Sequence, residues 1–117
     1  MGVFDNPDIE VTPERVAELL RSDPSVQLVD VREPYEWDAG RIAQAAHIEL
    51  ERLAARAGEI DRERPVVFQC RLGARSAMAA QAFRAAGYDA YTMTGGISRW
   101  VREGLPLEPD DGYVADH

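Results

Sequence analysis

Lysine is absent from this sequence and cysteine occurs once, and each shortage limits the chemistry available. All thirteen cationic residues are arginine, which excludes Schiff-base and other lysine-dependent catalysis. The lone cysteine, Cys70, cannot form an internal disulfide, so the fold does not depend on an oxidising compartment. No apolar run approaches the ~20 residues that span a bilayer, and the N-terminal sequence MGVFDNPDIE lacks a signal peptide's basic start and apolar stretch. We therefore expect a cytoplasmic protein with no membrane partner.

Positive charge is scarce as well, since the formal net charge is −8 at pH 7. This balance disfavours nucleic acid and anionic membranes as partners. Any anion site must be built from arginine, backbone N–H groups or a helix N-terminus. The two histidines, His47 and His117, lack the spacing of metal ligands, so we expect no metal site. A chain of 117 residues is ordinary for one domain.

Short apolar runs alternate with helical patterns along most of the chain. Such alternation implies right-handed crossovers and a mostly parallel sheet covered on both faces, which is an α/β fold. We expect a domain over residues 9–107, a loose extension over 1–8 and an acidic, mobile tail over 108–117. The predicted strands are 26–31, 66–69 and 89–93. One predicted helix begins at Thr12-Pro13, and the others cover 33–40, 49–60, 75–87 and 95–104.

Cys70 stands where the strand pattern VVFQ gives way to the loop pattern RLGARS. In parallel sheets, ligands bind at the carboxyl ends of strands, in the loops that lead to the next helix. A helix N-terminus and the nearby Arg71 and Arg75 would stabilise the reactive thiolate. Gly73 can adopt a positive φ, so that successive N–H groups would form a nest for an anion. Lone cysteines are more often inert and loop arginines more often solvated, but this combination favours a nucleophile.

Three motifs, in order along the chain, resemble those of the rhodanese-type sulfurtransferases. CRLGARS (70–76) resembles the family's active-site loop, which is roughly C-R-x-G-x-R-S. LVDVREPYEWDAGRI (28–42) and TGGISRWVREGLPL (94–107) resemble the family's D-V-R-E-P motif and its closing G-G-x-x-x-W motif. The resemblance spans 9–107 and implies a three-layer α/β/α domain with a mostly parallel central sheet of about five strands.

The resemblance also implies a function, in which Cys70 takes a sulfane sulfur from a donor such as thiosulfate and becomes a persulfide. The outer sulfur passes to a thiophilic acceptor such as cyanide or a thiol, or to a sulfur-accepting protein, with no cofactor. Asp30, Arg32 and Glu36 are expected to support the loop rather than to act as acids or bases. The residues expected to bind the substrate are Arg71, Leu72, Gly73, Ala74, Arg75 and Ser76.

The sequence departs from the family pattern just after the second motif. Arg41 replaces the family's usual histidine, and Gln44, His47 and Glu49 stand where glycine, asparagine and proline are frequent. These changes bear on substrate details and leave the predicted fold and the predicted role of Cys70 in place.

Two other functions stay open at this point. Cysteine-based phosphatases and arsenate reductases use a similar cradle, but their arginine follows five intervening residues, whereas four separate Cys70 from Arg75. The shorter loop makes a smaller pocket, better suited to one sulfur atom than to a phosphoryl group. The other alternative is a persulfide carrier or binding module that serves one protein partner with little thiosulfate turnover. With no second cysteine, an outside acceptor must release the sulfur.

Overall fold

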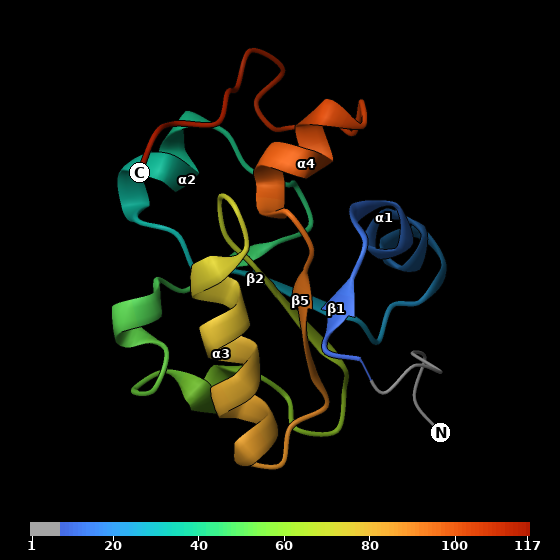
Figure 1. The fold of residues 1–117 in the computed structure, drawn as a ribbon, viewed down its shortest axis with the longest axis vertical. Coiled ribbons are helices and arrows are strands. Elements are labelled where there is room, and N and C mark those ends of the chain that lie inside the picture. Colours follow the sequence, from blue (N-terminus) through green and yellow to red (C-terminus); the bar gives the residue numbers. More distant parts are fainter. Residues whose placement is uncertain (1–7) are drawn as a thin grey trace.

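The computed structural model describes residues 8–117, which form a parallel sheet with helices on both faces (Figure 1). Residues 1–7 of the expected N-terminal extension lie outside the described residues. The sheet has the strand order β1-β5-β4-β2-β3, and every neighbouring pair is parallel. The predicted α/β/α fold with about five strands is confirmed. The strands are β1 (Glu10–Val11), β2 (Gln27–Asp30), β3 (Ala46–His47), β4 (Val66–Gln69) and β5 (Ala90–Met93).

The helices begin and end where local sequence signals favour it. α1 starts as predicted, because Thr12 Oγ1 accepts a hydrogen bond from the Arg15 N–H at 3.2 Å and Pro13 occupies the first helical position. Among residues 8–117, no helix is both long and apolar enough to cross a membrane. The helices are α1 (Pro13–Ser22), α2 (Pro34–Ala39), α3 (Ala74–Ala85) and α4 (Gly96–Arg102), with 3₁₀ turns η1 (Leu50–Arg52) and η2 (Ala57–Glu59).

Side chains that alternate along the central strands enter two separate cores. Leu28 and Val67 pack in the core that also contains residues of α1 and α4. Val29 and Phe68 pack in the core that contains residues of α3. Burial on both faces explains why these strands read as continuous apolar runs. The strand order places β4 between β5 and β2. The loop that follows β4 therefore lies in the middle of the edge formed by the carboxyl ends of the strands.

The prediction of one helix over residues 49–60 is wrong, because the segment forms the two separate turns η1 and η2. Its start is tied to the segment that follows β2, since the Leu50 N–H donates to the Val31 carbonyl at 3.0 Å. Gly58 then disfavours helix in the second half. Leu53 nevertheless buries its side chain in the α3 core, which accounts for the apolar spacing that predicted a helix.

The C-terminal segment, residues 108–117, returns across α2 (Figure 1). Backbone hydrogen bonds join Arg41 and Glu108 in both directions, at 3.0 and 2.7 Å. Further along, the Tyr113 N–H donates to the Ala39 carbonyl at 3.0 Å. The stretch that we expected to be a mobile tail thus has regular contacts with the end of α2.

Candidate functional site

The thiol of Cys70 lies at the carboxyl end of β4, in the loop before α3. Cys70 is buried, and its Sγ accepts a hydrogen bond from the Gly73 N–H at 3.1 Å. Ser76 Oγ lies 3.5 Å from the sulfur and 2.7 Å from Thr92 Oγ1. N–H and hydroxyl groups near a sulfur stabilise negative charge on it. The loop therefore directs a backbone hydrogen-bond donor at Sγ.

Two glycines give this loop its shape. Gly73 has a φ of 112°, in the left-handed region, as predicted for a residue that turns its N–H back toward the sulfur. Gly96, at the start of α4, lies so close that a Cβ there would be 2.3 Å from the Cys70 carbonyl oxygen. The adjacent Ile97 N–H donates to that same oxygen at 2.8 Å. α4 thus holds the carbonyl side of the loop while an N–H on the other side faces the sulfur.

The approach of α4 is a part of the site that sequence reasoning missed. A glycine pair before a helix indicates a turn, and nothing in the local pattern shows what lies next to it. The one available signal was that this glycine pair belongs to the closing motif of the family resemblance.

Arg75 is engaged in an ion pair with Glu36. Its Nη1 and Nη2 donate to the two carboxylate oxygens at 2.8 and 3.1 Å, and Glu36 is fully buried. Burial opposes ionisation of Glu36, but hydrogen bonds from Arg75 and the Glu33 N–H, with the charge of Arg75, lower the pKa of Glu36. The hydrogen bond from Glu36 likewise raises the pKa of Arg75, against the effect of its burial. The pair ties the first turn of α3 to α2.

Acid should weaken this link. Because folding lowers the pKa of Glu36 below its ordinary 4.5, the pair contributes stability that is complete above about pH 4.5 and is lost as pH falls through the lowered value. We expect the stability difference between wild type and Glu36→Gln to shrink between about pH 7 and about pH 3, measured by urea denaturation. The stability difference between wild type and Arg75→Met should shrink over the same pH range. A constant difference for Glu36→Gln over this range would contradict the assignment.

Asp30 and Arg32 form a second ion pair, which is fully buried next to β4. Arg32 Nε lies 2.9 and 3.0 Å from the two Asp30 carboxylate oxygens, and Nη2 donates to Oδ2 at 2.7 Å. Nη2 also donates to the Gly40 carbonyl at 2.8 Å. In the sheet, Asp30 is the register partner of Gln69, the last residue of β4. The pair therefore fixes the loop after β2 beside the end of the strand that carries the thiol.

Arg71 is the other loop cation, and its side chain is 29% exposed. Its Nη2 lies 3.3 Å from Oδ1 of Asp116 in the C-terminal segment. Leu72 projects into solvent on the outer rim of the loop, and Ala74 begins α3. Both loop arginines that we expected to bind an anionic donor thus have carboxylate partners in this structure.

Two of the four departures from the family pattern, Arg41 and His47, pack against Trp37 of α2. The Arg41 guanidinium lies over the Trp37 ring at 5.3 Å, and the His47 ring stacks on Trp37 at 4.9 Å. His47 Nε2 is also 2.7 Å from the Arg32 carbonyl oxygen. Arginine in place of the family's histidine thus adds a cation–aromatic contact to the packing around the buried ion pair.

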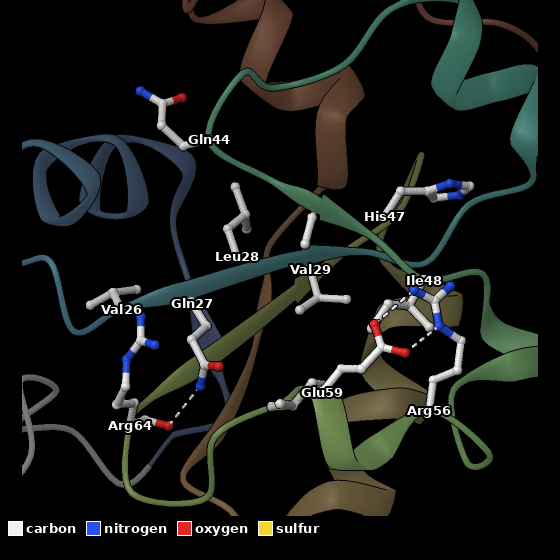
Figure 2. A pocket seen from close by; sticks show the side chains of 12 residues that line it. Val26, Gln27, Leu28, Val29, Gln44, His47, Ile48, Arg56, Glu59 and Arg64 are labelled. Atoms are coloured by element: carbon white, nitrogen blue, oxygen red, sulfur yellow. Dashed lines mark hydrogen bonds and ion pairs between the residues drawn. The ribbon is translucent and has the colours of Figure 1, made fainter.

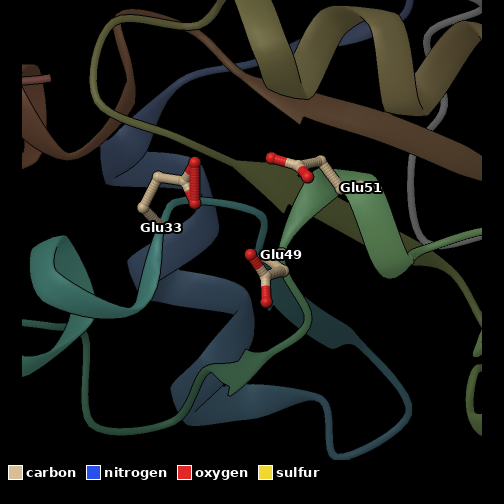
Figure 3. Close-up of side chains that lie close together, drawn as sticks. All are labelled: Glu33, Glu49 and Glu51. Carbon is tan, nitrogen blue, oxygen red and sulfur yellow. The ribbon is translucent and has the colours of Figure 1, made fainter.

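Three carboxylates lie close together (Figure 3), and they line a small cavity to which Arg75 also contributes. Glu33, Glu49 and Glu51 each place one oxygen within 4.8 Å of the others, and His117 also lines this cavity. Acidic groups often cluster at protein surfaces without a metal, so this cluster alone is not evidence for a metal site. Its consequence for the site is electrostatic, because it makes the surroundings of the loop less favourable to anions.

A second cavity, of about 260 Å³, lies along β2 and β3 (Figure 2). Several of its polar groups form hydrogen bonds with one another. Gln27 Nε2 donates to the Arg64 carbonyl at 3.3 Å, and Arg56 donates to Glu59 at 2.7 and 2.8 Å. Gln44, another departure from the family pattern, lines this cavity, but no residue of the loop 70–76 does. The candidate site is therefore the loop at Cys70.

Known proteins with similar sequences include sulfurtransferases. A sequence model of the rhodanese-like domain matches residues 12–103. The chain is 36% identical over 104 residues to a sulfurtransferase of Allochromatium vinosum, covering 88% of this chain and 97% of that protein. It is 31% identical over 100 residues to the thiosulfate sulfurtransferase GlpE of Actinobacillus pleuropneumoniae, covering 85% of this chain and 92% of that protein.

Solved structures agree with these sequence matches. The crystal structure of a rhodanese-related protein from Thermoplasma volcanium has a TM-score of 0.78 and 27% sequence identity, and the match covers 86% of this chain and 97% of that one. The parallel sheet, the order of the three motifs and the family match over most of the chain agree. The chain belongs to the rhodanese-like domain family of sulfurtransferases.

Proposed function

We propose that the protein carries a sulfane sulfur on Cys70 between a donor such as thiosulfate and a thiophilic acceptor. The Cys70 thiolate attacks the outer sulfur of thiosulfate and forms a new S–S bond, while the donor's S–S bond breaks and sulfite leaves with the electron pair. Cyanide or a thiolate then attacks the outer sulfur, and Cys70 leaves as the thiolate. Each step exchanges one bond to sulfur for another, so it requires no oxidant, cofactor or general base.

The observation that carries this proposal is the hydrogen bond from the Gly73 N–H to Sγ, in a loop that leads into α3. The thiolate and the persulfide both bear negative charge, and backbone donors at a helix N-terminus stabilise such charge. In this proposal the loop 71–76 binds the outer sulfur. Asp30, Arg32 and Glu36 are positioning residues, because their ion pairs fix the segments on either side of the loop.

A phosphatase or arsenate reductase function has less support. Phosphoryl transfer requires an arginine that grips the equatorial oxygens of the substrate. Arg75 follows Cys70 one residue too early for that motif, and both of its terminal nitrogens already donate to Glu36.

Intact-mass analysis tests the proposed function directly. After incubation with thiosulfate, wild type should gain the mass of one sulfur atom, and Cys70→Ser should gain none. Serine is close in size to cysteine and its hydroxyl can accept the Gly73 N–H, so this variant should stay folded. Cyanide should then remove the adduct and release thiocyanate. A wild-type protein that gains no sulfur from thiosulfate or any other sulfane donor would refute the proposal.

The second candidate is a persulfide carrier that serves one protein partner. It would form the same adduct but release it slowly to cyanide, so steady-state thiocyanate production separates the two. The exposed Leu72 at the rim of the loop offers a contact for such a partner. A cytoplasmic location stays a prediction.

A further inference from the structure

The C-terminal segment brings a carboxylate to the rim of the thiol loop. Asp116 Oδ1 lies 3.3 Å from Nη2 of Arg71, the residue that follows Cys70. A second contact holds the same residue in place, because the Tyr35 hydroxyl donates to the Asp116 carbonyl at 3.0 Å. An acidic side chain and its backbone are thus both positioned beside the loop.

The fold provides specifically for this return of the chain. A Cβ at Gly40 would lie 2.5 Å from the Tyr113 carbonyl oxygen, so only glycine allows the segment to pass so close to the end of α2. The Tyr113 N–H is bonded to the Ala39 carbonyl, and Asp116 follows three residues later. The segment is therefore anchored before it reaches Arg71.

Arg71 is the loop arginine that a donor anion can reach. Arg75 donates to both oxygens of the buried Glu36, whereas Arg71 is paired with a side chain that is 98% exposed. Ion pairs between exposed groups are weak and open readily, while buried bidentate pairs persist. An incoming anion can thus displace Asp116 from Arg71 but cannot displace Glu36 from Arg75.

We propose that Asp116 is a specificity-determining residue, an internal carboxylate that competes with anionic sulfur donors for Arg71. The inference rests on the proposed sulfur transfer at Cys70. A doubly charged donor such as thiosulfate must displace Asp116 and also meets its negative charge. A donor that brings little or no negative charge meets neither penalty. The carboxylate therefore shifts the preference of the site from small dianions toward donors of lower charge.

Steady-state kinetics provide the first test. Asp116→Asn should lower the KM for thiosulfate about two- to fivefold and leave kcat nearly unchanged, because an exposed ion pair is weak. Asp110→Asn is the matched control, since it removes one negative charge from an exposed position of the same segment. An equal fall in KM for both variants, or no fall for Asp116→Asn, would overturn the proposal.

Alkylation of the thiol provides a readout that does not depend on sulfur transfer. We expect Asp116→Asn to raise the rate with anionic iodoacetate relative to neutral iodoacetamide, and Asp110→Asn to leave this ratio unchanged. In an Arg71→Gln background, Asp116→Asn should lose most of its effect. If the ratio of alkylation rates changes as expected but no sulfur adduct forms, only the proposed function is contradicted. An unchanged ratio in a protein that does transfer sulfur would contradict the role of Asp116 alone.

Discussion

Gly96→Ala is expected to abolish sulfur loading on Cys70 and to lower the free energy of unfolding by about 2–4 kcal/mol. The new Cβ would lie 2.3 Å from the Cys70 carbonyl oxygen and 2.5 Å from that of Arg71, both backbone atoms that cannot rotate away. The position also has a φ of 61°, which residues other than glycine rarely adopt. Relief of the clash must move α4 away from the loop, which breaks the hydrogen bond from Ile97 that anchors it.

The matched control is Gly104→Ala. Gly104 also has a positive φ, 79°, but a Cβ there meets nothing within 4 Å. The strained backbone of this variant should lower its free energy of unfolding by only about 1 kcal/mol, and the variant should load sulfur like wild type. Urea denaturation measures the stability of both variants, and intact mass after thiosulfate measures loading. If Gly96→Ala loads sulfur at the wild-type rate, contact with α4 does not shape the loop.

The second large effect is expected at the buried pair of Asp30 and Arg32. Asp30→Asn keeps the shape of the side chain but removes the charge that compensates a fully buried guanidinium. Breaking a buried pair by neutralising one partner destabilises a protein by about 3–5 kcal/mol, because the remaining charge is left uncompensated. For a small domain this is a large part of the total stability, so we expect a much lower urea midpoint.

Two comparisons identify the source of this effect. Glu59→Gln breaks the exposed pair with Arg56 and should leave the urea midpoint nearly unchanged. Replacing both partners, as Asp30→Asn with Arg32→Met, should recover part of the stability lost by Asp30→Asn, since no buried charge is left over. A midpoint for Asp30→Asn as high as that of Glu59→Gln would show that the pair contributes little.

The sequence predicted those parts of the site that depend on local chemistry. The strand end at Cys70, the positive φ of Gly73 and the helix that follows all have local signals, in β-branched residues, glycine and an alanine-rich stretch. The helix predicted over 49–60 failed because its apolar spacing reflects burial of Leu53, which the short turns η1 and η2 achieve without a continuous helix.

Partners far apart in the sequence had no such signal. The pairing of Arg75 with Glu36 spans 39 positions and that of Arg71 with Asp116 spans 45, so no local pattern indicates that either arginine is occupied. The residue types at the site were predictable, but the availability of their charges was not, because it depends on how the chain folds back.

The hydrogen bond from Ile97 to the Cys70 carbonyl also sets an order of events during synthesis. β1 pairs with β5 through Val11 and Met93, and α4 reaches the loop only after both are present. A ribosome-bound chain that stops before α4 carries the thiol without the anchor for its loop. Contacts of such long sequence separation also form slowly. The newly made protein therefore cannot anchor the loop at Cys70 until nearly the whole domain has been translated.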